Sequence, residues 1–237
     1  MSLRILQGHP MISSARKELE NRGLSSVPRW PWRSIFAILR LGRLFSGDYV
    51  KSWDVWQTAM LLEDQCDTTD AIVDFGAYKS EILEVLLRMG YTSLHGIDLN
   101  PALVSSPLRD RIQYTVGDFF ATGFPDNSFA AVTSISAIEH GLDVGRLFRE
   151  VARVLKPGGL FVCSTDYWPE KIDTSGINVL GMPWTIFSER ELAGVIEHAM
   201  SLGLRPLGDL NYKASEKVIR HAGRAYTFAW FALRKIA

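Results

Sequence analysis

Apolar and polar positions change their spacing along the chain near residue 70. Beyond this point, short apolar runs alternate with segments whose apolar residues recur every three or four positions. The short runs predict strands and the periodic segments predict helices. Strands that alternate with helices form a mainly parallel sheet with helices on both faces. The predicted strands are 71–75, 93–97, 111–116, 130–135, 160–164 and 226–233, and the predicted helices are 81–89, 144–155 and 188–202.

The residues before position 70 follow a helical spacing instead. Apolar residues alternate with arginines after Pro31, which predicts an amphipathic helix, and residues 52–62 predict a second one. The segment 29–51 contains five basic residues and one acidic residue, with tryptophans interleaved. We therefore expect an N-terminal helical lid or extension over residues 1–69 and one α/β domain over residues 70–237.

The composition is that of an ordinary globular protein. The 237 residues suffice for a full core without disulfide or metal staples. Lys and Arg together number 26, as do Asp and Glu, and the resulting net charge of zero argues against nucleic-acid binding by the whole molecule. Cys66 and Cys163 are too few for a disulfide framework, so we expect a cytoplasmic setting. The apolar stretch 34–45 is too short to span a bilayer and contains two arginines.

Acidic residues stand at the ends of three successive predicted strands. Asp74 and Gly76 end the first strand, Asp98 the second, and Asp118 the third, where Phe119 follows. Ligands of such sheets bind beyond the carboxyl ends of the strands. The two oxygens of a carboxylate can accept from both hydroxyls of a ribose, and a glycine lets the backbone approach a ligand closely. This arrangement predicts an adenosine site.

Six short motifs in this order resemble the class I S-adenosylmethionine-dependent methyltransferases, in their small-molecule branch. Each motif alone is weak evidence, and the order and spacing together are strong evidence. The resemblance is close over residues 70–165 and weaker beyond them. The motifs are IVDFGA at 72–77, HGIDLN at 95–100, VGDF at 116–119, FPDNSF at 124–129, SISAIEH at 134–140 and LKPGGL at 155–160.

The resemblance implies a Rossmann-like, seven-stranded sheet in the order 3-2-1-4-5-7-6, with strand 7 antiparallel. It also implies S-adenosyl-L-methionine as cofactor and S-adenosyl-L-homocysteine as product. Asp98 would bind the ribose, Asp118 and Phe119 the adenine, and Ser134 would face the methyl-transfer cleft. The expected cofactor-binding residues are Asp74, Gly76, Ala77, Tyr78, Asp98, Leu99, Asp118, Phe119 and Ser134.

The chain departs from the family pattern in the loop after the first strand. Tyr78 and Ser80 stand where the family has its second and third glycines. A tyrosine does not permit the same close approach of the backbone to a ligand, unless its side chain points away while its backbone dihedral angles stay ordinary. The Tyr78 ring therefore either covers the cofactor or weakens its binding.

Two residues are candidates for catalysis. An acceptor that must lose a proton is helped by a general base, and His140, after the fourth strand, has a suitable pKa range. Asp166 follows the fifth strand and can act as a base or orient a hydroxyl. Both residues also fit a structural role. Glu139 and His140 have no third ligand at a metal-binding spacing, so we expect no metal site.

The predicted function is methyl transfer from S-adenosyl-L-methionine to a small-molecule acceptor, such as a hydroxyl of a sugar or related metabolite. The preference for a sugar rests on a resemblance to glycan-cluster enzymes in residues 77–80 and 164–168. The alternatives are a non-catalytic relative with weakened cofactor binding and a nucleic-acid methyltransferase. The basic N-terminal segment is interpreted as a lid, with contact to a membrane surface or stacking on bases as alternatives.

Overall fold

The computed structural model describes residues 2–26, 48–106, 108–141, 143–179 and 181–236. The helix predicted after Pro31 lies outside these residues. None of the described helices combines the length and the apolar character that a bilayer span requires. The elements are β1 (Leu3–Ile5), α1 (His9–Asn21), η2 (Tyr49–Lys51), α3 (Ser52–Gln65), β2 (Ala71–Phe75), α4 (Ile82–Arg88), β3 (Ser93–Asp98), η3 (Pro101–Ser105), β4 (Gln113–Val116), β5 (Phe129–Ile135), α5 (Val144–Val154), β6 (Leu155–Tyr167), β7 (Asn178–Val179), β8 (Met182–Pro183), α6 (Glu189–Ser201), β9 (Leu204–Pro206), β10 (Ile219–His221) and β11 (Arg224–Lys235).

The central sheet has the strand order that the resemblance implied. Strands β4, β3, β2, β5, β6 and β11 lie side by side, and β9 pairs with the outer edge of β11. The strands from β4 to β6 are parallel, whereas β11 is antiparallel to both β6 and β9. Numbered along the chain, this arrangement is 3-2-1-4-5-7-6 with an antiparallel strand 7. The expected fold class is confirmed.

Three short strands share the outer edge of β11. β10 pairs with its first residues, β1 with its middle and β9 with its last residues, all antiparallel. The backbone of Ser2 extends the contact, because its N–H donates to the Asp209 carbonyl and its carbonyl accepts from the Ala232 N–H, both at 2.9 Å. The N-terminal segment thus contributes a strand to the sheet in addition to its helices.

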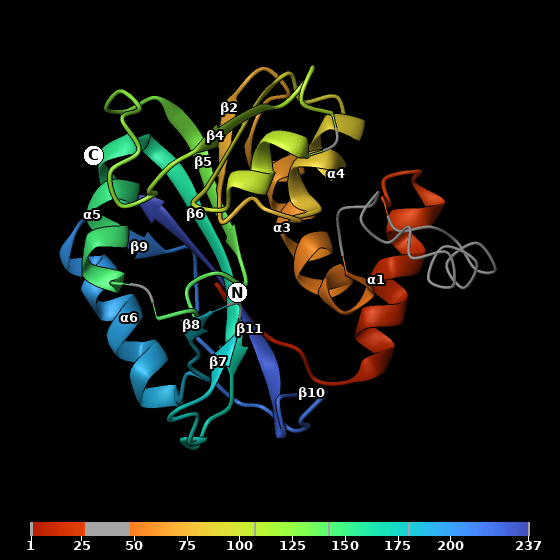
Figure 1. The fold of residues 1–237 in the computed structure, drawn as a ribbon, viewed down its shortest axis with the longest axis vertical. Coiled ribbons are helices and arrows are strands. Elements are labelled where there is room, and N and C mark those ends of the chain that lie inside the picture. The colour runs from red at the N-terminus through yellow and green to blue at the C-terminus, as the bar shows by residue number, and fades with distance from the viewer. Residues whose placement is uncertain (1, 27–47, 107, 142, 180, 237) are drawn as a thin grey trace.

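Helices cover both faces of the sheet. Figure 1 shows α1, α3 and α4 on one face and α5 and α6 on the other. Ile72 and Trp230 are buried on the first face, and their neighbours Val73 and Phe231 on the second. Successive residues of a strand point to opposite faces, so each strand contributes to both apolar layers. The carboxyl ends of the parallel strands therefore project from a rigid core.

Local sequence sets several element boundaries. The capping box predicted at the start of α6 is present: the Ser188 hydroxyl accepts from the Glu191 N–H at 3.3 Å, and the Ser188 N–H donates to the Glu191 carboxylate at 2.8 Å. Strand β6 begins earlier than the predicted residue 160. Leu155 already pairs with Phe129, and the Lys-Pro-Gly-Gly turn forms an irregularity before the regular pairing with β5 resumes.

A buried ion pair joins the N-terminal helices to the segment that follows β2. Arg16 of α1 donates two hydrogen bonds to the Glu81 carboxylate, at 3.1 and 3.0 Å, and one to the Ser52 hydroxyl at 2.8 Å. Glu81 also accepts from the Ser26 N–H at 2.9 Å. Arg16 is 3% exposed and Glu81 is 2% exposed. This network fixes the start of α3 relative to the loop after β2.

Candidate cofactor and acceptor site

The chain turns sharply where β2 ends, and the turn requires glycine. Gly76 has a φ of +85°, and a Cβ at this position would lie 2.8 Å from the Cβ of Ala137. The N–H groups of Gly76 and Ala77 donate to the Ile97 carbonyl at 3.0 and 3.2 Å. The backbone of the turn is therefore held beside the carboxyl ends of β3 and β5.

Asp74 is fully buried just before this turn. Its Oδ1 accepts from the Thr133 hydroxyl at 2.6 Å, and its Oδ2 has no hydrogen-bond partner among the described residues. Burial raises the pKa of Asp74 to about 7, although the nearby hydroxyls of Thr133 and Ser80 oppose the increase. A buried carboxyl oxygen without a partner is suited to a donor group from a ligand.

Asp98 presents both carboxylate oxygens in a fixed orientation. Its Oδ2 accepts from the Tyr78 N–H at 3.0 Å, and its Oδ1 accepts from the Asn100 N–H at 2.8 Å. Each oxygen keeps acceptor capacity for a further donor. Leu99, which follows, is 57% exposed and offers open apolar surface beside the carboxylate. This geometry fits two adjacent hydroxyls, such as those of a ribose, with an apolar ring nearby.

Tyr78 takes the place of a glycine without a strained backbone. Among the described residues of this loop, the non-glycine residue with positive φ is Lys79, at +64°. The Tyr78 ring is half-buried and packs against the apolar layer on the α1, α3 and α4 side. The substitution therefore leaves the Gly76 turn and the contact between Tyr78 and Asp98 intact.

Asp118 and Phe119 follow β4 and have different surroundings. The Asp118 side chain is 39% exposed, and its Oδ1 accepts from the Phe120 N–H at 2.8 Å. Arg146 lies 3.4 Å from Oδ2 and stacks over the Phe120 ring. Phe119 is only 6% exposed and stacks on Phe75 with ring centroids 5.8 Å apart. Asp118 remains open to an adenine amino group, and the contact of Phe119 with the adenine stays a prediction.

Two further residues expected in the cofactor site face the protein interior. Ala77 is 3% exposed, and a Cβ added to Gly96 would lie 2.8 Å from its side chain. Ser134 is 1% exposed, and its hydroxyl donates to the Phe75 carbonyl at 3.1 Å. Both side chains support the strand ends, and their contribution to cofactor binding stays a prediction.

His140 lies half-buried in the segment after β5. Its Nδ1 is buried and has no hydrogen-bond partner among the described residues. Burial lowers the pKa of His140, and the positive charges of Lys51 and His221 lower it further. An imidazole that stays neutral at physiological pH can accept a proton.

Asp166 lies close to a second buried carboxyl group, Glu139. The Asp166 Oδ2 accepts from the Trp184 indole N–H at 2.7 Å, and a Glu139 oxygen accepts from the Thr165 hydroxyl at 3.2 Å. Burial raises the pKa of Asp166. Burial and the charge of Asp166 together raise the pKa of Glu139 to about 8.

No group of three or more His, Cys, Asp or Glu side chains in the described part of the chain could hold a metal ion.

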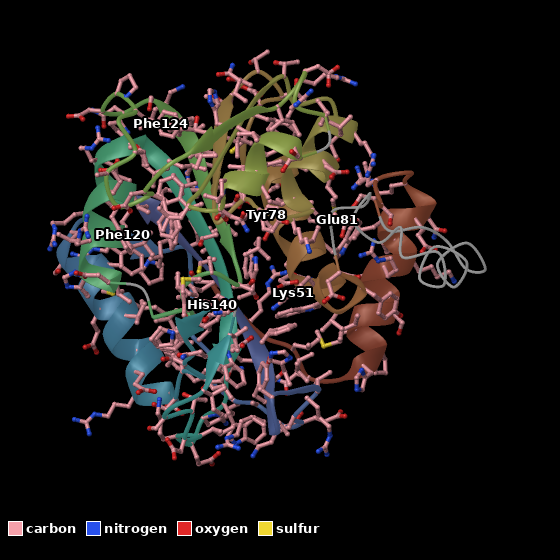
Figure 2. The ribbon with its side chains drawn as sticks, in the orientation of Figure 1. Lys51, Tyr78, Glu81, Phe120, Phe124 and His140 are labelled. Carbon is pink, nitrogen blue, oxygen red and sulfur yellow. The ribbon has the colours of Figure 1, made fainter. Side chains whose placement is uncertain are left out.

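Lys51 is a site residue that sequence reasoning missed. Its ammonium donates to the Ser136 hydroxyl and lies 3.5 Å from the centroid of the Phe228 ring. Figure 2 shows Lys51 in the central part of the molecule, together with Tyr78 and His140. Because 85 positions separate Lys51 from Ser136, no local motif could have indicated the contact.

The comparison with protein families matches the centre of the chain to a known domain. Residues 73–163 match the model of the methyltransferase domain family. This segment runs from β2 into β6 and contains Asp74, Gly76, Asp98, Asp118 and His140. Residues 73–163 therefore match a methyltransferase domain, and the resemblance to class I S-adenosylmethionine-dependent methyltransferases is confirmed.

Curated relatives match this chain over part of their length. A sterol 24-C-methyltransferase of Gibberella zeae is 46% identical over 54 residues, which are 23% of this chain and 14% of that protein. A demethylmenaquinone methyltransferase of Symbiobacterium thermophilum is 27% identical over 121 residues, which are 47% of this chain and 48% of that protein. The chain thus matches about one seventh of the first relative and about half of the second.

Solved structures match the fold over most of the chain. The geranyl diphosphate C-methyltransferase of Streptomyces coelicolor, in complex with Mg²⁺, geranyl diphosphate and S-adenosyl-L-homocysteine, has a TM-score of 0.60 at 19% identity, covering 91% of this chain and 87% of that one. A putative sarcosine dimethylglycine methyltransferase of Galdieria sulphuraria also has a TM-score of 0.60, at 18% identity, covering 94% and 98%. At this identity the likeness establishes the fold. Together with the family match, it identifies S-adenosyl-L-methionine as the cofactor of the class.

Proposed function

We propose that this protein transfers a methyl group from S-adenosyl-L-methionine to a hydroxyl oxygen of a small molecule, such as a sugar or related metabolite. The observation that carries the proposal is the Asp98 carboxylate, which the N–H groups of Tyr78 and Asn100 orient beside the glycine turn at the strand ends. Both oxygens keep acceptor capacity, as the binding of two vicinal hydroxyls requires.

Residues at the ends of different strands bind different parts of the cofactor. Asp98 accepts from the ribose hydroxyls, and Asp118 accepts from the adenine amino group. The turn at Gly76 brings backbone close to the methionine part, where the free Oδ2 of Asp74 takes a donor group. When bound, the cofactor supplies a methyl group already activated by a sulfonium. The protein then has to hold the acceptor in line with that group.

The acceptor oxygen loses its proton to a group at the ends of β5 and β6. His140, kept neutral by burial, and Asp166 are the proposed proton acceptors. The oxygen lone pair would form the new C–O bond as the methyl–sulfur bond breaks and S-adenosyl-L-homocysteine leaves, and the proton stays on the protein until solvent removes it. The names of the curated relatives support a small acceptor, because the molecules that they methylate are a sterol and a quinone precursor.

Residues 1–69 are proposed to act as the cover of this site, in a cytoplasmic protein. Arg16 connects α1 to Glu81, three residues beyond Tyr78, so the N-terminal helices are joined to the loop that holds the cofactor.

Isothermal titration calorimetry with S-adenosyl-L-methionine and S-adenosyl-L-homocysteine tests the proposal. We expect a dissociation constant in the micromolar range for both ligands. Transfer of a radiolabelled methyl group to a panel of sugars, phenols and matched amines then tests the acceptor class. Absence of binding at millimolar ligand would show that the protein has kept the fold without the activity.

A further inference from the structure

We propose that Lys51 is a catalytic residue of the acceptor site. Its ammonium binds the acceptor oxygen as that oxygen loses its proton, and it thereby selects hydroxyl over amine acceptors. This inference rests on the proposed methyl transfer and adds to it a residue from outside the methyltransferase domain match.

Lys51 is placed at the methyl-transfer end of the site by both of its neighbours. Its ammonium contacts Ser136, the first residue after β5, where the backbone is in the left-handed region with a φ of +51°. The Ser136 N–H donates to the Ser164 carbonyl of β6 at 3.0 Å, which maintains this unusual conformation. Such strain in a non-glycine residue is concentrated at functional sites. The next residue along from Lys51 is Ser52, which Arg16 holds in the buried ion-pair network.

The hydrogen-bonding capacity of the ammonium is not used up by the protein. A lysine ammonium has three donor hydrogens and no acceptor. In the described part of the chain it meets one oxygen acceptor, the Ser136 hydroxyl, and one aromatic face, Phe228, and it forms no ion pair there. A ligand atom that uses the remaining capacity must carry a lone pair. A hydroxyl oxygen meets this requirement and becomes negative as it loses its proton, so the ammonium stabilises it. The nitrogen of a neutral amine also carries a lone pair, but it becomes positive as it is methylated, and the ammonium disfavours that charge.

The charges around Lys51 leave room for a negative oxygen. The carboxyl groups near it are buried, and burial raises the pKa of Asp54 to about 6 and that of Glu139 to about 8. Asp54 also has a buried Oδ1 without a partner among the described residues. Near neutral pH Glu139 is therefore largely protonated and does not neutralise the lysine charge, whereas Asp54 is largely ionised. The titratable groups that face this cluster are Asp54 from α3, Glu139 and His140 after β5, Asp166 from β6 and His221 from β10.

The proposed step begins when the acceptor hydroxyl loses its proton. The acceptor O–H bond breaks, the proton goes to His140 or Asp166, and the electron pair stays on the oxygen. Lys51 stabilises this developing charge through an N–H···O hydrogen bond in a site with little water. The same electron pair would then form the bond to the methyl carbon while the methyl–sulfur bond breaks, and the electrons of that bond would stay on the sulfur of the leaving S-adenosyl-L-homocysteine. Lys51 keeps its own protons throughout.

The test uses 4-nitrophenol as a probe of the oxyanion site, because its phenolate absorbs visible light. The full-length protein is saturated with S-adenosyl-L-homocysteine, and the phenolate absorbance is followed across a pH series. We expect wild-type protein to lower the pKa of the bound probe by about one unit, since a neighbouring opposite charge favours the ionised form. Lys51→Met should abolish the shift, and Lys51→Arg should retain most of it.

A matched control is Lys217→Met. The Lys217 ammonium is exposed and also lies over an aromatic ring, 4.8 Å from the Trp168 centroid, so its removal tests a cation–π contact outside the site. This variant should shift the probe as wild type does. A wild-type probe spectrum that the protein leaves unchanged, or an equal shift in Lys51→Met, overturns the role of Lys51. If S-adenosyl-L-homocysteine itself does not bind to wild type, the proposed function fails instead.

Discussion

The cofactor end and the acceptor end of the site are built in different ways. At the cofactor end, the N–H groups of Tyr78 and Asn100 orient Asp98 beside the glycine turn, and these groups lie within short motifs or directly after one. At the acceptor end, Lys51, Glu139 and Asp166 come from distant parts of the chain and interact through charge in a buried setting. The first end depends on backbone geometry and the second on protonation. The contact of Asp98 with the ribose should therefore vary little with pH, whereas the contribution of Asp74, whose pKa burial raises to about 7, and the acceptor chemistry should vary strongly.

Breaking the connection between the two ends should have the largest effect. Arg16→Met leaves the Glu81 carboxylate buried without its partner, and breaking a buried pair in this way costs about 3–5 kcal/mol. We expect this loss in the free energy of unfolding, measured by urea denaturation. Arg22→Met is the control, because its ion pair with Glu63 is partly exposed and contributes about 0–1 kcal/mol. Equal losses in the two variants would contradict a structural role for the buried network.

Removing the ribose contact should disable the cofactor end alone. Asp98→Ala deletes two charge-assisted hydrogen bonds to the ribose, and we expect affinity for S-adenosyl-L-homocysteine to fall about 100-fold or more. Calorimetry measures the affinity, and circular dichroism checks that the fold is retained. Asp110→Ala, at an exposed position before β4, should leave the affinity unchanged. Wild-type affinity in Asp98→Ala would mean that the ribose binds elsewhere.

The acceptor end should make stability depend on pH. Glu139 has a folded-state pKa raised to about 8, above its unfolded value, so the folded protein holds a proton that the unfolded chain releases. The free energy of unfolding should therefore fall as the pH rises from about 4.5 towards 8. Asp54 and Asp74, whose pKa values are raised to about 6 and about 7, also make the free energy of unfolding fall as the pH rises, but over narrower pH ranges.

Glu139→Gln should make the free energy of unfolding less dependent on pH. The slope is set by the number of protons that the folded state binds in excess of the unfolded state, and the substitution should reduce this number by up to about one. Urea denaturation at several pH values measures the slope. Glu170→Gln, an exposed position, should preserve the wild-type slope. A wild-type slope in Glu139→Gln would assign the pH dependence to other groups.

The smallest effect concerns the loop beside the cofactor. Lys79 has a φ of +64°, which glycine adopts more easily, so Lys79→Gly should stabilise the protein by about 1 kcal/mol. Ala222→Gly relieves a comparable φ of +44° in the turn between β10 and β11. The midpoint temperature of thermal unfolding should rise in both variants. Cofactor affinity should change only in Lys79→Gly, and a change in Ala222→Gly would argue against a local effect of the loop.

The fold and the cofactor end were largely predictable because their signals are local. Short apolar runs and the turns that follow them indicated the strands, and Asp74, Gly76 and Asp98 stand at fixed places in those turns. The start of β6 was placed too late because Leu155 pairs with Phe129 across an irregularity, which an apolar run does not reveal.

The acceptor end could be predicted only in part. His140 follows β5, as expected, whereas Asp166, expected after the fifth strand, lies within β6, which extends to Tyr167. The pKa shifts of both residues depend on burial and on charges from other elements. The contact of Lys51 with Ser136 joins residues 85 positions apart, and the core position of Phe119 depends on its stacking against Phe75. Tertiary packing decides these features, and one sequence contains no periodicity that reports it.

The pairing of β1 with β11 has a consequence for the order of folding. Leu3 lies opposite Phe231, so this edge of the sheet closes a loop of nearly the whole chain. Closing so long a loop carries a high entropic cost, and contacts of such sequence separation slow folding. Because β1 precedes β11 in the chain, β1 must wait until β11 has been synthesised. Until then β1 has no partner strand, and the nascent protein exposes unpaired strand groups to its neighbours.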